Sequence, residues 1–137
     1  MINTLAAYIK TQLETITDLT GKVYIQPVDN VEYPAAIILF TGTESEWVSN
    51  RTTWRTYRFK IQLTYDIGSG SLSDSLVDSK LYDLADSVLD KFEVLRGAGG
   101  VADICTLGTG TCGWLDNERQ LRYNDVLLDF KVTRAAS

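Results

Sequence analysis

The stretch from residue 57 to 67, YRFKIQLTYDI, is the feature that most limits how this chain can fold. Apolar and aromatic residues stand at every second position, and polar or charged residues stand between them. Because successive side chains of a β-strand point to opposite faces, this period predicts a strand with one face on a core and the other toward water. The predicted core face consists of Tyr57, Phe59, Ile61, Leu63, Tyr65 and Ile67.

The other predicted strands lie on both sides of this one. A short strand follows Gly21 at 23–25, and another lies near 102–107. The run YPAAIILF (33–40) is continuously apolar, which predicts a central strand buried on both faces. A last strand is predicted where Val126, Leu128, Phe130 and Val132 alternate with Leu127, Asp129, Lys131 and Thr133.

Two stretches have the spacing of amphipathic helices. Residues 2–16 carry an apolar stripe, with Asn3 or Thr4 as the predicted N-cap. A second helix begins after Ser71 or Ser73 as its cap and ends before RGAGG (96–100), a glycine-rich helix stop. Its buried stripe is predicted to be Val77, Leu81, Leu84, Ala85, Val88 and Phe92.

These elements follow the order α-β-β-β-α-β-β. This order predicts a single α+β domain over residues 1–137, in which two helices pack on one face of a mostly antiparallel or mixed sheet.

The sequence GTGTCG at 108–113 fits the dinucleotide-binding pattern G-x-G-x-x-G. That site requires a helix after the glycines, but the residues at 116–120, DNERQ, are all polar and give such a helix little apolar surface. We expect instead a hairpin with a type II′ turn at Gly108-Thr109, which would make Cys105 and Cys112 cross-strand neighbours. They would remain thiols in the cytoplasm and could oxidise outside a cell or in a particle.

Composition excludes several classes of site. The chain has no histidine, so Ser-His-Asp, Cys-His and histidine-containing zinc sites are excluded. Its net charge of −5 argues against a basic nucleic-acid-binding protein. No stretch resembles a signal peptide or is long and apolar enough to span a bilayer, so we expect no membrane partner. No cofactor, metal or catalytic residue is predicted.

The charges are segregated along the chain. Residues 66–93 hold seven acidic and two basic residues, whereas residues 47–65 hold Arg51, Arg55, Arg58 and Lys60 and no acid. Both segments could simply be solvated faces. In a ring built by head-to-tail contacts, however, different patches of each subunit must match, and a basic strand edge could meet the acidic helix of the next copy.

This layout resembles that of the tail-terminator (tail-completion) proteins of long-tailed bacteriophages. The resemblance rests on the pattern of LAAYIKTQLETI, of GKVYIQPVDNVEYPAAIIL, of YRFKIQLTYDI, of SLVDSKLYDLADSVLDKF and of VLLDFKVT. It implies a structural virion protein with no catalytic residues, which is made in the host cytoplasm and forms a ring, usually a hexamer, in the neck. Its partners would be its own copies, the tail tube protein and the head-completion or connector protein, and DNA would pass through the channel without specific binding.

The resemblance also suggests where contacts lie. The excursion 41–55 between two strands is predicted to be a loop that contacts the tube or a neighbouring copy, and the region of Gly108–Trp114 is a second candidate. An acidic face on the second helix would line the channel, because a negative lumen lets DNA slide. The candidate contact residues are Glu44, Glu46, Trp47, Arg51, Trp54, Arg55 and Trp114, and the candidate acidic face is Asp74, Asp78, Asp86 and Asp90.

Other functions stay open at this stage. A different neck or tail component, such as a head-completion or tube protein, would share the same size and charge. A small cellular module could use exposed tryptophans to bind a peptide or a sugar. An enzyme would have to use carboxylates or the glycine-rich segment. The acids spaced by fours and eights from Asp74 also suggest a metal site, but no second acidic cluster completes it.

Overall fold

The computed structural model describes residues 1–25, 31–49, 51–67, 74–94, 102, 104–115 and 121–135. Five strands form one sheet in the order β1-β2-β3-β5-β4. β1 pairs with β2 in parallel, and the other pairings are antiparallel. The elements are α1 (Ile2–Leu13), a 3₁₀ turn (Thr17–Leu19), β1 (Val23–Tyr24), β2 (Ala35–Ser49), β3 (Thr52–Asp66), α2 (Asp74–Val94), β4 (Ile104–Trp114) and β5 (Leu121–Ala135).

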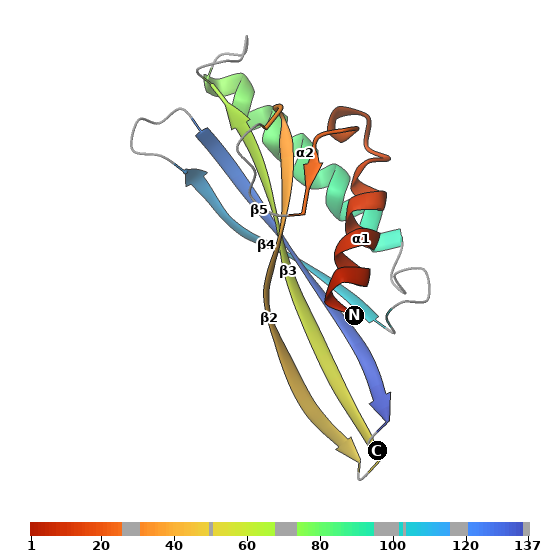
Figure 1. Ribbon diagram of the computed structural model, residues 1–137. Coiled ribbons are helices and arrows are strands. Elements are labelled where there is room, and N and C mark those ends of the chain that lie inside the picture. The colour runs from red at the N-terminus through yellow and green to blue at the C-terminus, as the bar shows by residue number, and fades with distance from the viewer. Residues whose placement is uncertain are drawn as a thin grey trace.

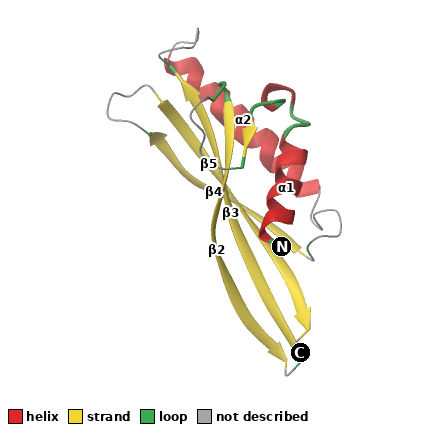
Figure 2. Cartoon of the chain, viewed as in Figure 1, coloured by secondary structure: helices red, strands yellow, loops and turns green. Residues whose placement is uncertain are grey.

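Both α-helices lie on the same face of the sheet, and none of the described elements covers the opposite face (Figures 1 and 2). The α+β class and the element order predicted from the sequence are therefore confirmed within the described residues. A single helical layer suffices because β3 and β5 are mainly apolar on one face, so one covering layer removes most of their apolar surface from water.

The core lies between α1, α2 and the helix-side face of β3 and β5. The period-two prediction for β3 is confirmed from Tyr57 to Tyr65, since Tyr57, Phe59, Ile61, Leu63 and Tyr65 are all buried. The sixth predicted residue, Ile67, follows the end of β3 and is half-buried. The α2 stripe is confirmed at every predicted position, because Val77, Leu81, Leu84, Ala85, Val88 and Phe92 are buried. On β5, Val126, Leu128 and Phe130 complete the same layer, and the fourth predicted residue, Val132, is half-buried.

Two local predictions near the N-terminus are wrong. Asn3 and Thr4 do not cap α1: the helix begins at Ile2, with Met1 at the N-cap position and no side-chain cap hydrogen bond from the described residues. β2 is not buried on both faces, because the helices cover one face only. Ala36 and Ile38 are buried against that layer, whereas Ile37 and Leu39 on the other face are half-buried.

The segment 41–55 is not a loop. β2 and β3 pair with each other from Ala35↔Thr64 to Ser49↔Thr52, with bulges after Phe40 and Trp47, and β3 pairs with β5 down to Thr52↔Ala135. Polar residues form a strand here because they pair with residues of neighbouring strands. The sequence of this segment alone does not show those partners. Residues 41–49, 52–56 and 131–135 thus form a three-stranded extension, called the arm below, which reaches beyond both helices (Figure 1).

The hairpin predicted at GTGTCG is also wrong. β4 runs through all six residues as one strand paired with β5, so Cys105 lies opposite Phe130 and Cys112 lies opposite Asn124. The two cysteines are free and are not cross-strand neighbours. The register passes from Thr109↔Val126 to Cys112↔Asn124, so Gly110 and Thr111 together face Asp125 in a β-bulge.

Several sequence predictions lie outside the described residues. These are the caps Ser71 and Ser73, the helix stop at 96–100, and the polar segment 116–120. Asp74 begins α2, but its side chain is not among those described.

Candidate functional site: the arm and the adjoining groove

The arm exposes side chains on both of its faces, because neither described α-helix extends over it (Figure 1). Trp47 on β2 pairs with Thr53 on β3. Thr53 lies four residues before Tyr57, so both point to the helix side of the sheet, and Trp47 points to that side too. Its side chain is 74% exposed there. Trp54 pairs with Glu46 and lies on the opposite face, half-buried. A large, exposed aromatic side chain on a projecting strand is a typical anchor of a protein contact.

The basic residues of 47–65 do not form the predicted strand edge, because β3, which carries Arg55, Arg58 and Lys60, lies between β2 and β5. Two of these residues are also partly neutralised within the chain. The Arg58 guanidinium lies 2.6 Å from Glu44 and 3.7 Å from Asp129, and Lys60 Nζ lies 3.9 Å from Asp125. These acids belong to β2 and β5, so the absence of acid within 47–65 of the sequence does not describe the folded surface. The remaining basic residues of the segment are Arg51, which is exposed, and Arg55, whose Nη1 donates a hydrogen bond of 3.4 Å to the Tyr57 hydroxyl.

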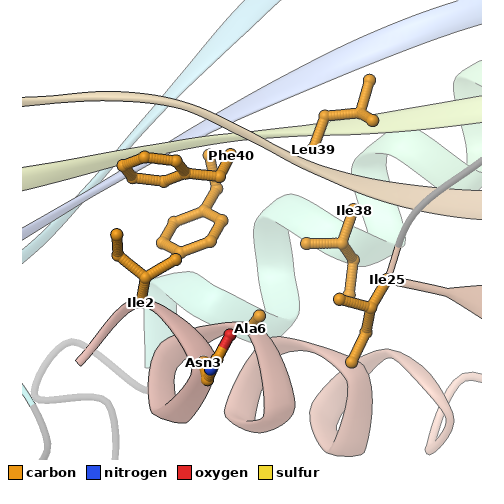
Figure 3. A pocket seen from close by; sticks show the side chains of 8 residues that line it. Ile2, Asn3, Ala6, Ile25, Ile38, Leu39 and Phe40 are labelled. Atoms are coloured by element: carbon orange, nitrogen blue, oxygen red, sulfur yellow. The ribbon is translucent and has the colours of Figure 1, made fainter.

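An apolar groove lies where the arm meets the body. It has a volume of about 280 Å³ and lies between the first turn of α1 and β2. Figure 3 shows Ile2 on α1 and Phe40 on β2 facing each other across it, with Ile25 and Ile38 farther along and Leu39 pointing away. Ile2, Ile25 and Phe40 are 38%, 41% and 41% exposed. Sequence patterns do not predict this groove, because it joins four separate segments of the chain: α1, the segment after β1, β2 and β3.

Trp114 belongs to a different region. It lies at the end of β4 opposite Arg122, whose guanidinium carbon is 5.0 Å from the centre of the indole ring. Arg122 also donates hydrogen bonds of 2.7 and 3.4 Å to the Asp78 carboxylate on α2. In register, Arg122 lies opposite Tyr65, whereas the arm ends at Thr52, so Trp114 and Trp47 are at opposite ends of the sheet.

The acidic residues of α2 are therefore not equivalent. Asp78 is held by Arg122 and fixes α2 onto β5. Asp86 and Asp90 are exposed, and so are Asp83 and Glu93. These exposed acids give α2 a negative outer surface, which is the part of the predicted acidic face that the structure leaves accessible.

A buried carboxylate on the open face of the sheet is a feature that the sequence does not predict. Asp125 is 3% exposed, accepts a hydrogen bond of 3.2 Å from Thr111 and lies near Lys60, while its Oδ1 atom is buried with no hydrogen-bond partner among the described residues. Burial raises the pKa of the Asp125 carboxyl, and Lys60, Thr111 and Gln62 offset only part of that shift. In the sequence, Asp125 stands at one of the polar positions of β5, and nothing there indicates that its side chain is buried.

This raised pKa predicts a specific pH dependence of stability. Folded protein binds the Asp125 proton more tightly than the unfolded chain, so the group stabilises the fold most below its ordinary pKa of 3.8 and loses that contribution as pH rises through the raised value. The free energy of unfolding of wild type relative to Asp125→Asn should therefore fall as pH rises across this window. Urea unfolding of both proteins at a series of pH values measures it, and a difference that does not change with pH would contradict the prediction.

The two thiols differ in chemistry. Burial, with a smaller effect of Asp129, raises the pKa of Cys105 to about 11, so this thiol stays protonated at neutral pH and is a poor nucleophile. Cys112 is exposed.

Within the described ranges, no three potential ligands from His, Cys, Asp and Glu gather where they could hold a metal ion.

Among the helices that the structure describes, none is long and apolar enough to cross a membrane. No protein-family model matches the chain, and no curated protein matches it either. The basis for a functional proposal is therefore the chemistry and the geometry of the residues themselves.

Proposed function

We propose that this chain is a structural subunit of a bacteriophage neck, a tail terminator that forms a ring of about six copies on the tail tube. The ring stops growth of the tube, offers a surface to which the head docks, and lets DNA pass through its channel. The single observation that carries this proposal is the arm, a three-stranded extension that reaches past the helical layer and exposes Trp47.

The arm suits assembly because a subunit that must hold neighbours in a ring needs two different, matching patches. One patch is the arm, with its exposed tryptophan. The body supplies the other patch, the apolar groove at α1. A compact domain whose sheet ended with its helices would present no such projection.

The acidic side of α2 suits a channel for DNA. Asp83, Asp86 and Asp90 are exposed along the helix, and the chain as a whole has a net charge of −5. A negative wall repels the phosphate backbone, so DNA slides past it instead of being bound. We place α2 toward the lumen of the ring for this reason.

The test is a tube-capping experiment. Native mass spectrometry and negative-stain imaging of the purified protein should show rings of about six copies. Tail tubes polymerised from the cognate tube protein should then stop growing when the rings are added, with one ring at one end of each tube. Rings that leave tube length unchanged but bind the head connector would assign the protein to the head side of the neck. Rings that bind neither would overturn the proposal.

A further inference from the structure

We propose that Trp47 on the arm of one copy inserts into the apolar groove of the next copy, between Ile2, Ile25 and Phe40. This contact would join the copies head to tail. The inference deepens the ring assembly proposed above and rests on it, since it names the residues that hold neighbouring copies together.

The groove is suited to an aromatic side chain. Its volume is about 280 Å³, and its apolar walls come from α1, from the segment after β1, from β2 and from Phe59 of β3. A smaller apolar cavity of about 150 Å³ in another protein is enough to bind benzene, so the larger indole ring can be accommodated here. Ile2, Ile25 and Phe40 each leave more than a third of their surface in water, which an inserted ring would cover.

The polar end of the groove matches the polar atom of tryptophan. A second hollow, which shares Ile2 and Asn3 with the groove, continues toward the base of the arm and includes Thr43. An indole N–H that becomes buried needs an acceptor. The side-chain oxygen atoms of Asn3 and Thr43 are available acceptors at that end of the groove.

Trp47 cannot occupy the groove of its own chain. Trp47 and Phe40 lie on the same strand, β2, and seven residues of extended chain span roughly 23 Å. β2 is held over this length by its pairing with β3, so it cannot fold back. A partner that covers the ring of Trp47, which is 74% exposed, therefore comes from outside the chain.

The edge of β2 adds a backbone surface to this contact. β1 pairs with β2 only at Ala36 and Ile37, and no other described strand pairs with that edge from Ile38 onward. An arriving arm can thus pair its backbone with this edge while Trp47 enters the groove beside it. A tryptophan alone buries about 150–250 Å², well below a stable interface, so this added pairing is needed.

The occupant is a second copy because the chain itself carries both halves of the contact. The exposed tryptophan and the apolar groove are different patches. When each copy gives its tryptophan to one neighbour and receives a tryptophan from another, the contact repeats from copy to copy until the ring closes. Each closed ring then contains as many such contacts as subunits, which makes individually weak contacts sufficient.

The test uses one variant for each half of the contact. Trp47→Ala removes the inserted ring, and Ile2→Glu places a charge in the groove while putting an acid at the helix N-terminus, where it does not destabilise α1. Each variant should weaken self-association by about thirty-fold or more, measured by analytical ultracentrifugation and native mass spectrometry. Matched controls are Leu127→Ala, at an exposed position on the open face of β5 outside the arm, and Leu76→Glu in the first turn of α2, and both should assemble like wild type.

Mixing the two defective variants gives the sharpest result. Trp47→Ala retains an intact groove and Ile2→Glu retains an intact tryptophan, so one copy of each should form a 1:1 dimer that grows no further. Rings formed by either single variant at wild-type concentrations would overturn the inference and leave the ring function standing. A mixture that stays monomeric, or wild-type protein that is monomeric at every concentration, would also overturn it. Wild-type rings that depend on Trp47 but cap no tube would refute the proposed function alone.

Discussion

Replacing Gly110 by alanine should lower the free energy of unfolding by about 1–3 kcal/mol, the usual effect of overpacking. A Cβ atom at Gly110 would lie 2.9 Å from the Cβ of Asp125 and 3.4 Å from Leu127. The first of these atoms is fixed to the backbone of β5, so it cannot move aside without distorting the bulge. Urea unfolding monitored by tryptophan fluorescence measures the loss.

Gly108 provides the matched control in the same strand. A Cβ there meets nothing within 4 Å, so Gly108→Ala should change stability by no more than about 0.5 kcal/mol. Equal losses at the two glycines would show that the bulge does not bring Gly110 against Asp125. The comparison thus tests why GTGTCG is rich in glycine: at Gly110 the reason is close packing against β5, not the approach of a phosphate.

Phe59→Ala should be more damaging than Gly110→Ala, with a loss of about 3–5 kcal/mol in the free energy of unfolding. Phe59 is 1% exposed and packs edge-to-face against Phe40 at 5.4 Å and Phe130 at 6.0 Å between ring centres. It lies where the arm leaves the body, so its removal opens a cavity at the base of the arm. Thermal and urea unfolding measure the loss in stability.

Phe40→Ala is the control for this effect. Phe40 contacts the same ring but is 41% exposed, so its truncation removes less buried surface and leaves no enclosed cavity. Its cost should be clearly smaller than that of Phe59→Ala. If Phe40→Ala is equally damaging, the groove must be more enclosed than its exposed walls indicate.

The failures of sequence-based prediction share a physical cause. The polar residues at 41–55 predict a loop, yet they form strands that pair with each other and with β5. A turn at Gly108 would place the two cysteines opposite each other, yet β4 continues straight through this glycine and pairs with β5. In both cases the deciding interaction is with a strand that is distant in sequence, and local propensity contains no information about it.

The residues of the candidate site also fall into two groups: those that the sequence identifies and those that only the fold reveals. Trp47 and Arg51 can be identified from the sequence, because large aromatic and basic residues in a polar segment are typical of contacts. Ile2, Ile25 and Phe40 cannot, since each looks like an ordinary core residue until the helices leave one edge of β2 uncovered. Arg58 and Glu44 look like unrelated charges in the sequence and are ion-pair partners in the fold.

The sequence by itself determined the α+β class, the order of the elements, and the buried stripes of β3, α2 and β5. It could do so because the period of burial is a local property: a helix or strand with one apolar face must turn that face to the core whatever its neighbours are. Only the tertiary structure decided the strand register, the arm, the bulge at Gly110 and the groove beside α1. These depend on which distant segments lie side by side, and that choice is made by the packing of the whole sheet and its single helical layer.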